Sequence, residues 1–226
     1  MSDFDSITEK INNGYNRLGH TLGWRFLTVS KQVLESNPEI VFLTLNPGGS
    51  AKYEEHPVAS CEQGCAYTHE QWSTHAVGRA PLQIQVQQLF STLATILGRD
   101  NTPQLMEQSL LAYFVPFRSP SWEALSRKDE SLDFAKNLWA SLFKHIHPRL
   151  IIVLGHEPFG QMATLMRSRL LGSESTETGW GTITAETNFY GGTSLVRLPH
   201  LSRFKLFGRE DSQPRMERLL ERAYNG

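Results

Sequence analysis

Short apolar runs alternate along the chain with longer segments whose apolar residues follow helical spacing. Four runs end in turn-forming residues and predict buried strands, at 40–45, 110–115, 150–154 and 194–198. Helical spacing predicts the intervening elements, at 6–36 with glycine interruptions, 81–98, 131–146, 157–171 and from Gln213 onward. Residues 180–190 alternate apolar with polar and end in Gly191-Gly192, which suggests an edge hairpin.

The order of these elements sets the expected fold. Strands that alternate with helices are typical of a mostly parallel sheet with helices on both faces. Neither repeats nor a linker break the pattern, and 226 residues are enough for one domain with a substantial core. We therefore expect a single α/β domain over residues 1–226, in three layers, with a central, mostly parallel four-stranded sheet flanked by helices.

Composition excludes several classes of protein. With 39% hydrophobic and 20% charged residues, the chain has the composition of a folded protein and not of a disordered one. No apolar run approaches the length of a membrane span, the acidic first residues hold no secretory signal, and two cysteines make no disulfide framework. We therefore expect a cytoplasmic monomer with no membrane partner.

Two strand ends carry the polar residues of chemical interest. The first strand runs into Asn-Pro-Gly-Gly-Ser at 46–50, and the last runs into Pro-His-Leu-Ser at 199–202. In open α/β sheets, ligands bind at the carboxyl ends of the strands. We therefore expect Asn46 and His200 to lie across one cleft, with Tyr113 or Phe114 in its wall.

The order of these motifs resembles the uracil-DNA glycosylase superfamily. In that family the first strand ends in Gly-X-Asn-Pro-Gly or a variant, matched here by Thr-Leu-Asn-Pro-Gly at 44–48, and a late strand ends in His-Pro-Ser, matched by His-Leu-Ser at 200–202. Gly-Arg-Ala-Pro at 78–81 stands where the family often carries Gly-Arg-Pro-Phe. The strand end at 113–120, Tyr-Phe-Val-Pro-Phe-Arg-Ser-Pro, matches a further family motif.

Three positions depart from the family pattern. Thr44 replaces the first Gly of the first motif, Tyr113 replaces the Asn that reads the uracil edge in many members, and Pro81 replaces the Phe that stacks on the base. The water-positioning and histidine-bearing loops are kept, whereas the base-reading parts are not. The resemblance thus implies the fold and the general chemistry better than it implies uracil as the substrate.

The resemblance implies a DNA glycosylase that hydrolyses the N-glycosidic bond of a deaminated or damaged base. It implies that Asn46 would hold the attacking water and that His200 would donate a hydrogen bond to the base oxygen on which charge develops. The Gly at 48 replaces a bulky Tyr that excludes thymine in the stricter uracil enzymes. The remaining substrate-binding residues that we expect are Leu45, Pro47, Gly48, Tyr113, Phe114 and Ser202.

DNA is the expected partner. The net charge of −1 gives no general attraction to nucleic acid, but residues 197–222 hold seven Lys/Arg and four Asp/Glu, a local excess of +3. Phe204 falls where the family places an apolar wedge that fills the gap left by a flipped base. The expected DNA-binding residues are Arg203, Phe204, Lys205 and Arg209. The same charges also suit the solvated face of a helix.

Other interpretations stay open. Cys61, Cys65, His69 and His75 are loosely compatible with a structural zinc site, although we expect no cofactor. Two cysteines are too few for the iron–sulfur cluster of some relatives. A non-catalytic nucleic-acid or nucleotide-binding protein on the same fold is the main alternative function. An unrelated small-molecule hydrolase ranks below it, because the chain lacks a Gly-X-Ser-X-Gly elbow.

Overall fold

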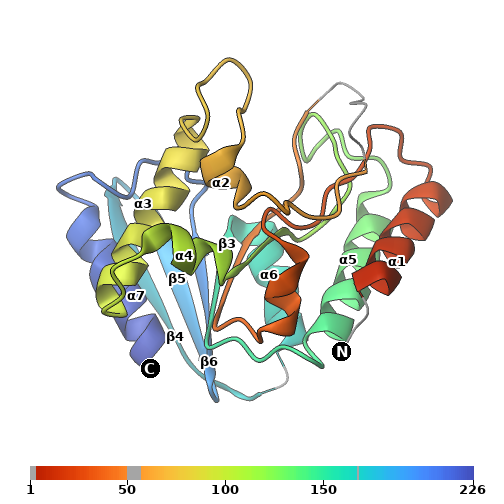
Figure 1. Cartoon of the computed structure of the whole chain (residues 1–226). Coiled ribbons are helices and arrows are strands. Elements are labelled where there is room, and N and C mark those ends of the chain that lie inside the picture. Colours follow the sequence, from red (N-terminus) through yellow and green to blue (C-terminus); the bar gives the residue numbers. More distant parts are fainter. Residues whose placement is uncertain (1–3, 50–56, 167) are drawn as a thin grey trace.

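A six-stranded sheet with helices on both faces forms the protein (Figure 1). The computed structural model describes residues 4–49, 57–166 and 168–226; Ser50 and the next six residues of the predicted loop lie outside these ranges. The strands are β1 (Ile40–Thr44), β2 (Leu110–Tyr113), β3 (Leu150–Leu154), β4 (Leu170–Trp180), β5 (Ile183–Tyr190) and β6 (Thr193–Leu198). The helices are α1 (Phe4–Arg17), the 3₁₀ helix η1 (Lys31–Glu35), α2 (Ala66–His69), α3 (Pro81–Ile96), α4 (Thr102–Glu107), α5 (Lys128–Leu142), α6 (His156–Leu165) and α7 (Gln213–Asn225).

The sheet order is β2-β1-β3-β6-β5-β4, and the first four of these strands are parallel. Their carboxyl ends therefore share one edge of the sheet. The chain leaves β1 for β2 on one side and then returns to β3 on the other side of β1. Such a reversal of direction is where ligands bind in open α/β sheets, just outside the strand ends.

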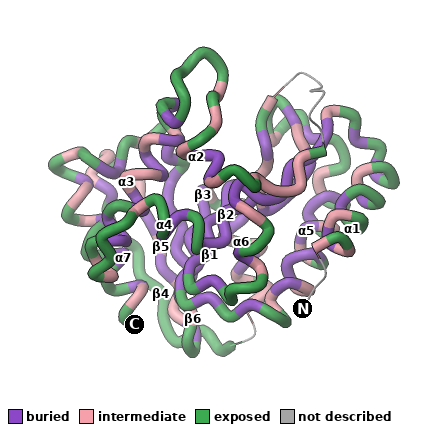
Figure 2. Tube along the Cα trace, viewed as in Figure 1, coloured by how far each residue is buried: buried purple, intermediate pink, exposed green. Residues whose placement is uncertain are grey.

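The centre of the sheet is the centre of the core. Every residue of β1 and β3 is buried, because helices cover both faces of these strands (Figure 2). In Figure 1, α1 and α5 lie on one side of the sheet, and α3, α4 and α7 lie on the other. The four predicted strands and the predicted helix at 81–98 are confirmed, although β2 ends at Tyr113 and α5 covers Lys128–Leu142.

The prediction of one interrupted helix over 6–36 is wrong beyond Arg17. Gly19 and Gly23 have φ values of +69° and +83°, which only glycine adopts without strain, and the helix ends before them. The residues that follow lie beside β2 and its continuation instead: Trp24 bridges Phe117, and Leu27 bridges Ala112.

The prediction of a helix over 157–171 and of an edge hairpin at 180–190 also needs correction. α6 ends at Leu165, and β4 begins at Leu170. β5 pairs with β4 on one side and with β6 on the other, so β4 is the edge strand and the sheet has six strands, not four. Most side chains of β4 are exposed, so the sequence carries no alternation there that could have indicated a strand.

No helix among the described residues is long and apolar enough to cross a membrane.

Candidate active site at the carboxyl edge of the parallel strands

Asn46 follows β1, and its side-chain amide is held by the loop after β2. Asn46 Nδ2 donates to Ser119 Oγ at 2.7 Å, and to the main-chain oxygens of Phe117 and Pro47 at 3.3 Å each. Because main-chain oxygens only accept, these contacts fix which end of the amide is the nitrogen. Asn46 Oδ1 accepts no hydrogen bond from the described part of the chain, which leaves it able to accept one from a water molecule.

Main-chain hydrogen bonds join the segments that follow β1 and β2. The main-chain N–H of Phe114 donates to Thr44 O and that of Val115 to Leu45 O, both at 2.8 Å, and Ser119 N–H donates to Pro47 O at 3.2 Å. These bonds continue the parallel pairing of β1 and β2 beyond the strands. The turn that carries Asn46 is therefore anchored to a second segment and not a free loop.

His200 follows β6 and is exposed to solvent, whereas its neighbours Pro199 and Leu201 are buried. Its Nδ1 accepts from the Ser202 main-chain N–H at 3.4 Å and contacts Ser202 Oγ at 2.7 Å. A main-chain N–H only donates, so Nδ1 carries no proton and Nε2 carries the hydrogen of the neutral ring. Protein atoms packed around the imidazole lower the pKa of His200, and the charge of Arg203 lowers it further.

Asn46 and His200 leave the same edge of the sheet, with the end of β3 between their strands. The loop after β2 lies close to both the Asn46 turn and the loop that carries His200. Ser119 in this loop binds Asn46, and Glu123, four residues on, lies near Arg203. The pKa of Glu123 is lowered first by its own backbone N–H, then by Ser121, and also by the charges of Lys128 and Arg203.

The expected substrate-binding residues differ in exposure. Leu45 and Tyr113 are half-buried and Gly48 is exposed, whereas Pro47 and Phe114 are buried, Phe114 fully so. The main-chain oxygen of Gly48 accepts a hydrogen bond from Arg118. Ser202 is exposed as well, so the members of this set with surface that a ligand can reach are Leu45, Gly48, Tyr113 and Ser202.

The sequence analysis missed a partly buried ion pair beside Tyr113, between Arg25 and Glu70. Arg25 Nη1 and Nη2 donate to the two carboxylate oxygens of Glu70, at 2.9 and 2.5 Å, and Trp72 Nε1 donates to Glu70 at 3.0 Å. Burial alone raises the pKa of a carboxyl group, but the bonds from Arg25 outweigh it and lower the pKa of Glu70 to about 2. Arg25 and Glu70 are far apart in the sequence, so no local pattern signals their pairing.

Cys61 belongs to the same cluster as Arg25 and Glu70. Cys61 Sγ lies 2.7 Å from Arg25 Nη2 and 3.1 Å from a Glu70 oxygen, and burial raises the pKa of its thiol to about 12. His69 Nδ1 contacts Thr68 Oγ1 at 2.7 Å. Within residues 4–49, 57–166 and 168–226, no group of three or more His, Cys, Asp or Glu could hold a metal ion. The alternative set of Cys61, Cys65, His69 and His75 is thus not brought together.

The expected DNA-binding residues separate into two kinds. Arg203 and Lys205 are exposed, and neither forms an ion pair with a described residue. Phe204 is half-buried against the edge of the Trp180 ring. Arg209 is engaged within the protein: its Nη1 donates to Gly179 O at 2.6 Å, and its guanidinium lies 4.6 Å from the centre of the Trp180 ring.

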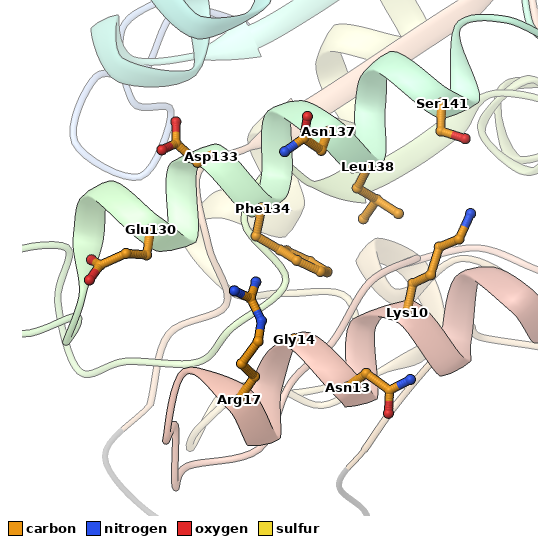
Figure 3. Close-up of a pocket in the computed structure, with 10 residues that line it drawn as sticks. All are labelled: Lys10, Asn13, Gly14, Arg17, Glu130, Asp133, Phe134, Asn137, Leu138 and Ser141. Carbon is orange, nitrogen blue, oxygen red and sulfur yellow. The ribbon is translucent and has the colours of Figure 1, made fainter.

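A groove of about 630 Å³ lies elsewhere, between α1 and α5 (Figure 3). Lys10 and Arg17 reach into it from α1, and Phe134 forms part of its wall from α5. A Cβ atom at Gly14 would lie 2.5 Å from the Phe134 ring, so glycine is what allows the two helices to approach here. Neither Asn46 nor His200 lines this groove.

Comparison with models of known families finds no match for this chain, and comparison with curated proteins finds none either. The resemblance to the uracil-DNA glycosylase superfamily therefore rests on the strand-end motifs and on their order along the chain, and it stays a prediction.

Proposed function

We propose that the protein is a DNA glycosylase that hydrolyses the N-glycosidic bond of a deaminated or damaged base. The observation that carries the proposal is the state of the two polar side chains at one sheet edge. The amide nitrogen of Asn46 and Nδ1 of His200 are engaged, while Asn46 Oδ1 and His200 Nε2 have no hydrogen-bond partner among the described residues. One group can accept from a water molecule, and the other can donate to a leaving base.

The proposed reaction uses these two side chains, a water molecule and a flipped nucleotide. The water oxygen forms a bond to C1′ of the sugar while the bond from C1′ to the base nitrogen breaks, and the electron pair of that bond leaves with the base. His200 Nε2–H stabilises the negative charge that develops on a carbonyl oxygen of the base. Asn46 Oδ1 orients the water but takes no proton, because an amide does not titrate; that proton passes to solvent or to the departing base.

The lowered pKa of His200 supports this role. A neutral imidazole at physiological pH keeps Nδ1 as the acceptor for Ser202 N–H and so keeps the hydrogen on Nε2, available to a ligand. Arg203 and Lys205, exposed in the same loop, are suited to contact phosphates of the DNA backbone.

The test is base release from a panel of oligonucleotides, each with one modified base, in single-stranded and duplex form. Abasic sites are detected by cleavage in alkali, and Asn46→Ala is the control for a contaminating activity. We expect at least one base to be released by the wild type and not by the variant. Salt-dependent DNA binding without release of any base would favour the alternative, a non-catalytic nucleic-acid-binding protein, for which Tyr113 in place of the base-reading Asn is the supporting observation.

A further inference from the structure

The tip of the β4–β5 hairpin is attached to the loop that follows His200. Trp180 Nε1 donates to the main-chain oxygen of Lys205 at 3.0 Å, and the Trp180 ring meets Phe204 edge to face with 5.8 Å between ring centres. Phe204 is only partly buried, and Trp180 is its one aromatic contact among the residues described. The indole thus holds both the side chain of Phe204 and the main chain of the next residue.

A second set of contacts fixes the indole itself. The Arg209 guanidinium covers the Trp180 ring at 4.6 Å while its Nη1 donates to Gly179 O at 2.6 Å. Gly179 has a φ of +80°, and a Cβ atom there would lie 2.8 Å from Asp211 O. Only glycine fits this approach, so the hairpin tip and residues 209–211 are packed as one unit.

We propose that Trp180 is a positioning residue for Phe204, and that the β4–β5 hairpin serves to hold the Phe204 loop ready to enter DNA. This inference rests on the proposed function and on the expectation, drawn from the family resemblance, that Phe204 fills the space left by a flipped base. It assigns a function to β4 and β5, the two strands that extend the four parallel strands of the sheet. A wedge needs a rigid support, because an aromatic ring that rotates freely loses entropy when it inserts between bases.

The proposal reassigns Arg209. Its guanidinium contacts Gly179 O, the Trp180 ring and, at 3.1 Å, Asp211. In this proposal Arg209 holds Trp180 in place, while Arg203 and Lys205 remain available to phosphates. Among the contacts of Trp180, the one with the Phe204 ring is the one that bears on base flipping. Removing the indole therefore affects base flipping and leaves the number of phosphate contacts unchanged.

The experiment measures base flipping by the fluorescence of 2-aminopurine placed beside the base that the wild type releases fastest. The variants are Trp180→Ala, Phe204→Ala and the double variant, with Trp180→Phe as a milder change that keeps a ring but loses the N–H donor to Lys205. The matched control is Phe189→Ala, which removes a ring from the same hairpin where Arg222 lies 5.8 Å from its centre, away from the Phe204 loop.

Trp180→Ala is expected to lower the flipping equilibrium about tenfold, since it loses one hydrogen bond and one aromatic pair, and Trp180→Phe less. The salt dependence of binding stays the same, Phe189→Ala flips like the wild type, and Trp180→Ala adds nothing in the Phe204→Ala background. Wild-type flipping by Trp180→Ala and Trp180→Phe overturns the inference, and so does an equal loss with and without Phe204. A wild type that neither releases nor flips any base refutes the proposed function itself, which separates the two failures.

Discussion

Ser119→Ala tests whether the orientation of Asn46, and not only its presence, matters for the reaction. Ser119 is 2% exposed, and its Oγ accepts from Asn46 Nδ2 and donates to Ser121 O, both at 2.7 Å. Each such neutral hydrogen bond contributes about 0.5–1.5 kcal/mol, so the variant should lose about 1–3 kcal/mol of unfolding free energy. Asn46 keeps its two longer bonds to Phe117 O and Pro47 O, and its amide is loosened and not released.

The expected effect on the rate follows from the same contacts. Loss of a transition-state donor typically costs about 10²–10³ in rate, and a loosened group should cost less, about tenfold, which corresponds to about 1.4 kcal/mol of barrier. The assay is single-turnover base release with excess protein, alongside urea unfolding. Ser121→Ala, in the same loop but exposed, is the control. A wild-type rate for Ser119→Ala, or an undiminished tenfold loss in the Asn46→Ala background, would refute the reasoning.

Three further predictions concern charges. Arg203→Ala should raise the pKa of His200 toward its ordinary value, while Lys205→Ala should not; NMR titration of the imidazole decides, and an unchanged pKa in Arg203→Ala contradicts the assignment. On duplex DNA, Arg203→Ala should also reduce the slope of log K against log salt concentration by about 0.9. Arg209→Ala should leave this slope unchanged and lower the melting temperature of the protein; the reverse pattern would make Arg209 the DNA contact. Because the pKa of Glu70 is lowered to about 2, its stabilising effect is present above its unfolded pKa and is lost as pH falls toward 2; acid unfolding of Glu70→Gln should lack this component, and identical curves would argue against it.

Strong local patterns explain what the sequence could predict. The runs at β1 and β3 are apolar throughout because both faces of a central parallel strand are covered, and such runs are hard to mistake. The Pro at position 81 marked the start of α3 correctly, since its fixed φ suits the first turn. The turns at Asn46 and His200 were placed at one sheet edge by the parallel order alone.

What was missed depends on contacts between distant segments. β4 lies at an edge with little burial, and its sequence does not alternate. Residues 24–27 form bridges to Phe117, Val58 and Ala112, which lie far from them in the sequence. Arg25 pairs with Glu70 across 45 residues, and Arg209 is engaged by a hairpin 30 residues earlier. No local pattern in the sequence indicates either of these contacts, and whether Arg209 also contacts DNA stays a prediction.

The most direct test of the central claim is the single-turnover rate of base release by Asn46→Ala and by His200→Ala, measured on the oligonucleotide that the wild type cleaves best. We predict that each substitution lowers the rate by about 10²–10³ while the dissociation constant for the same DNA stays nearly unchanged. Release at the wild-type rate by both variants would mean that these residues only form turns and that the edge of the sheet is not the active site.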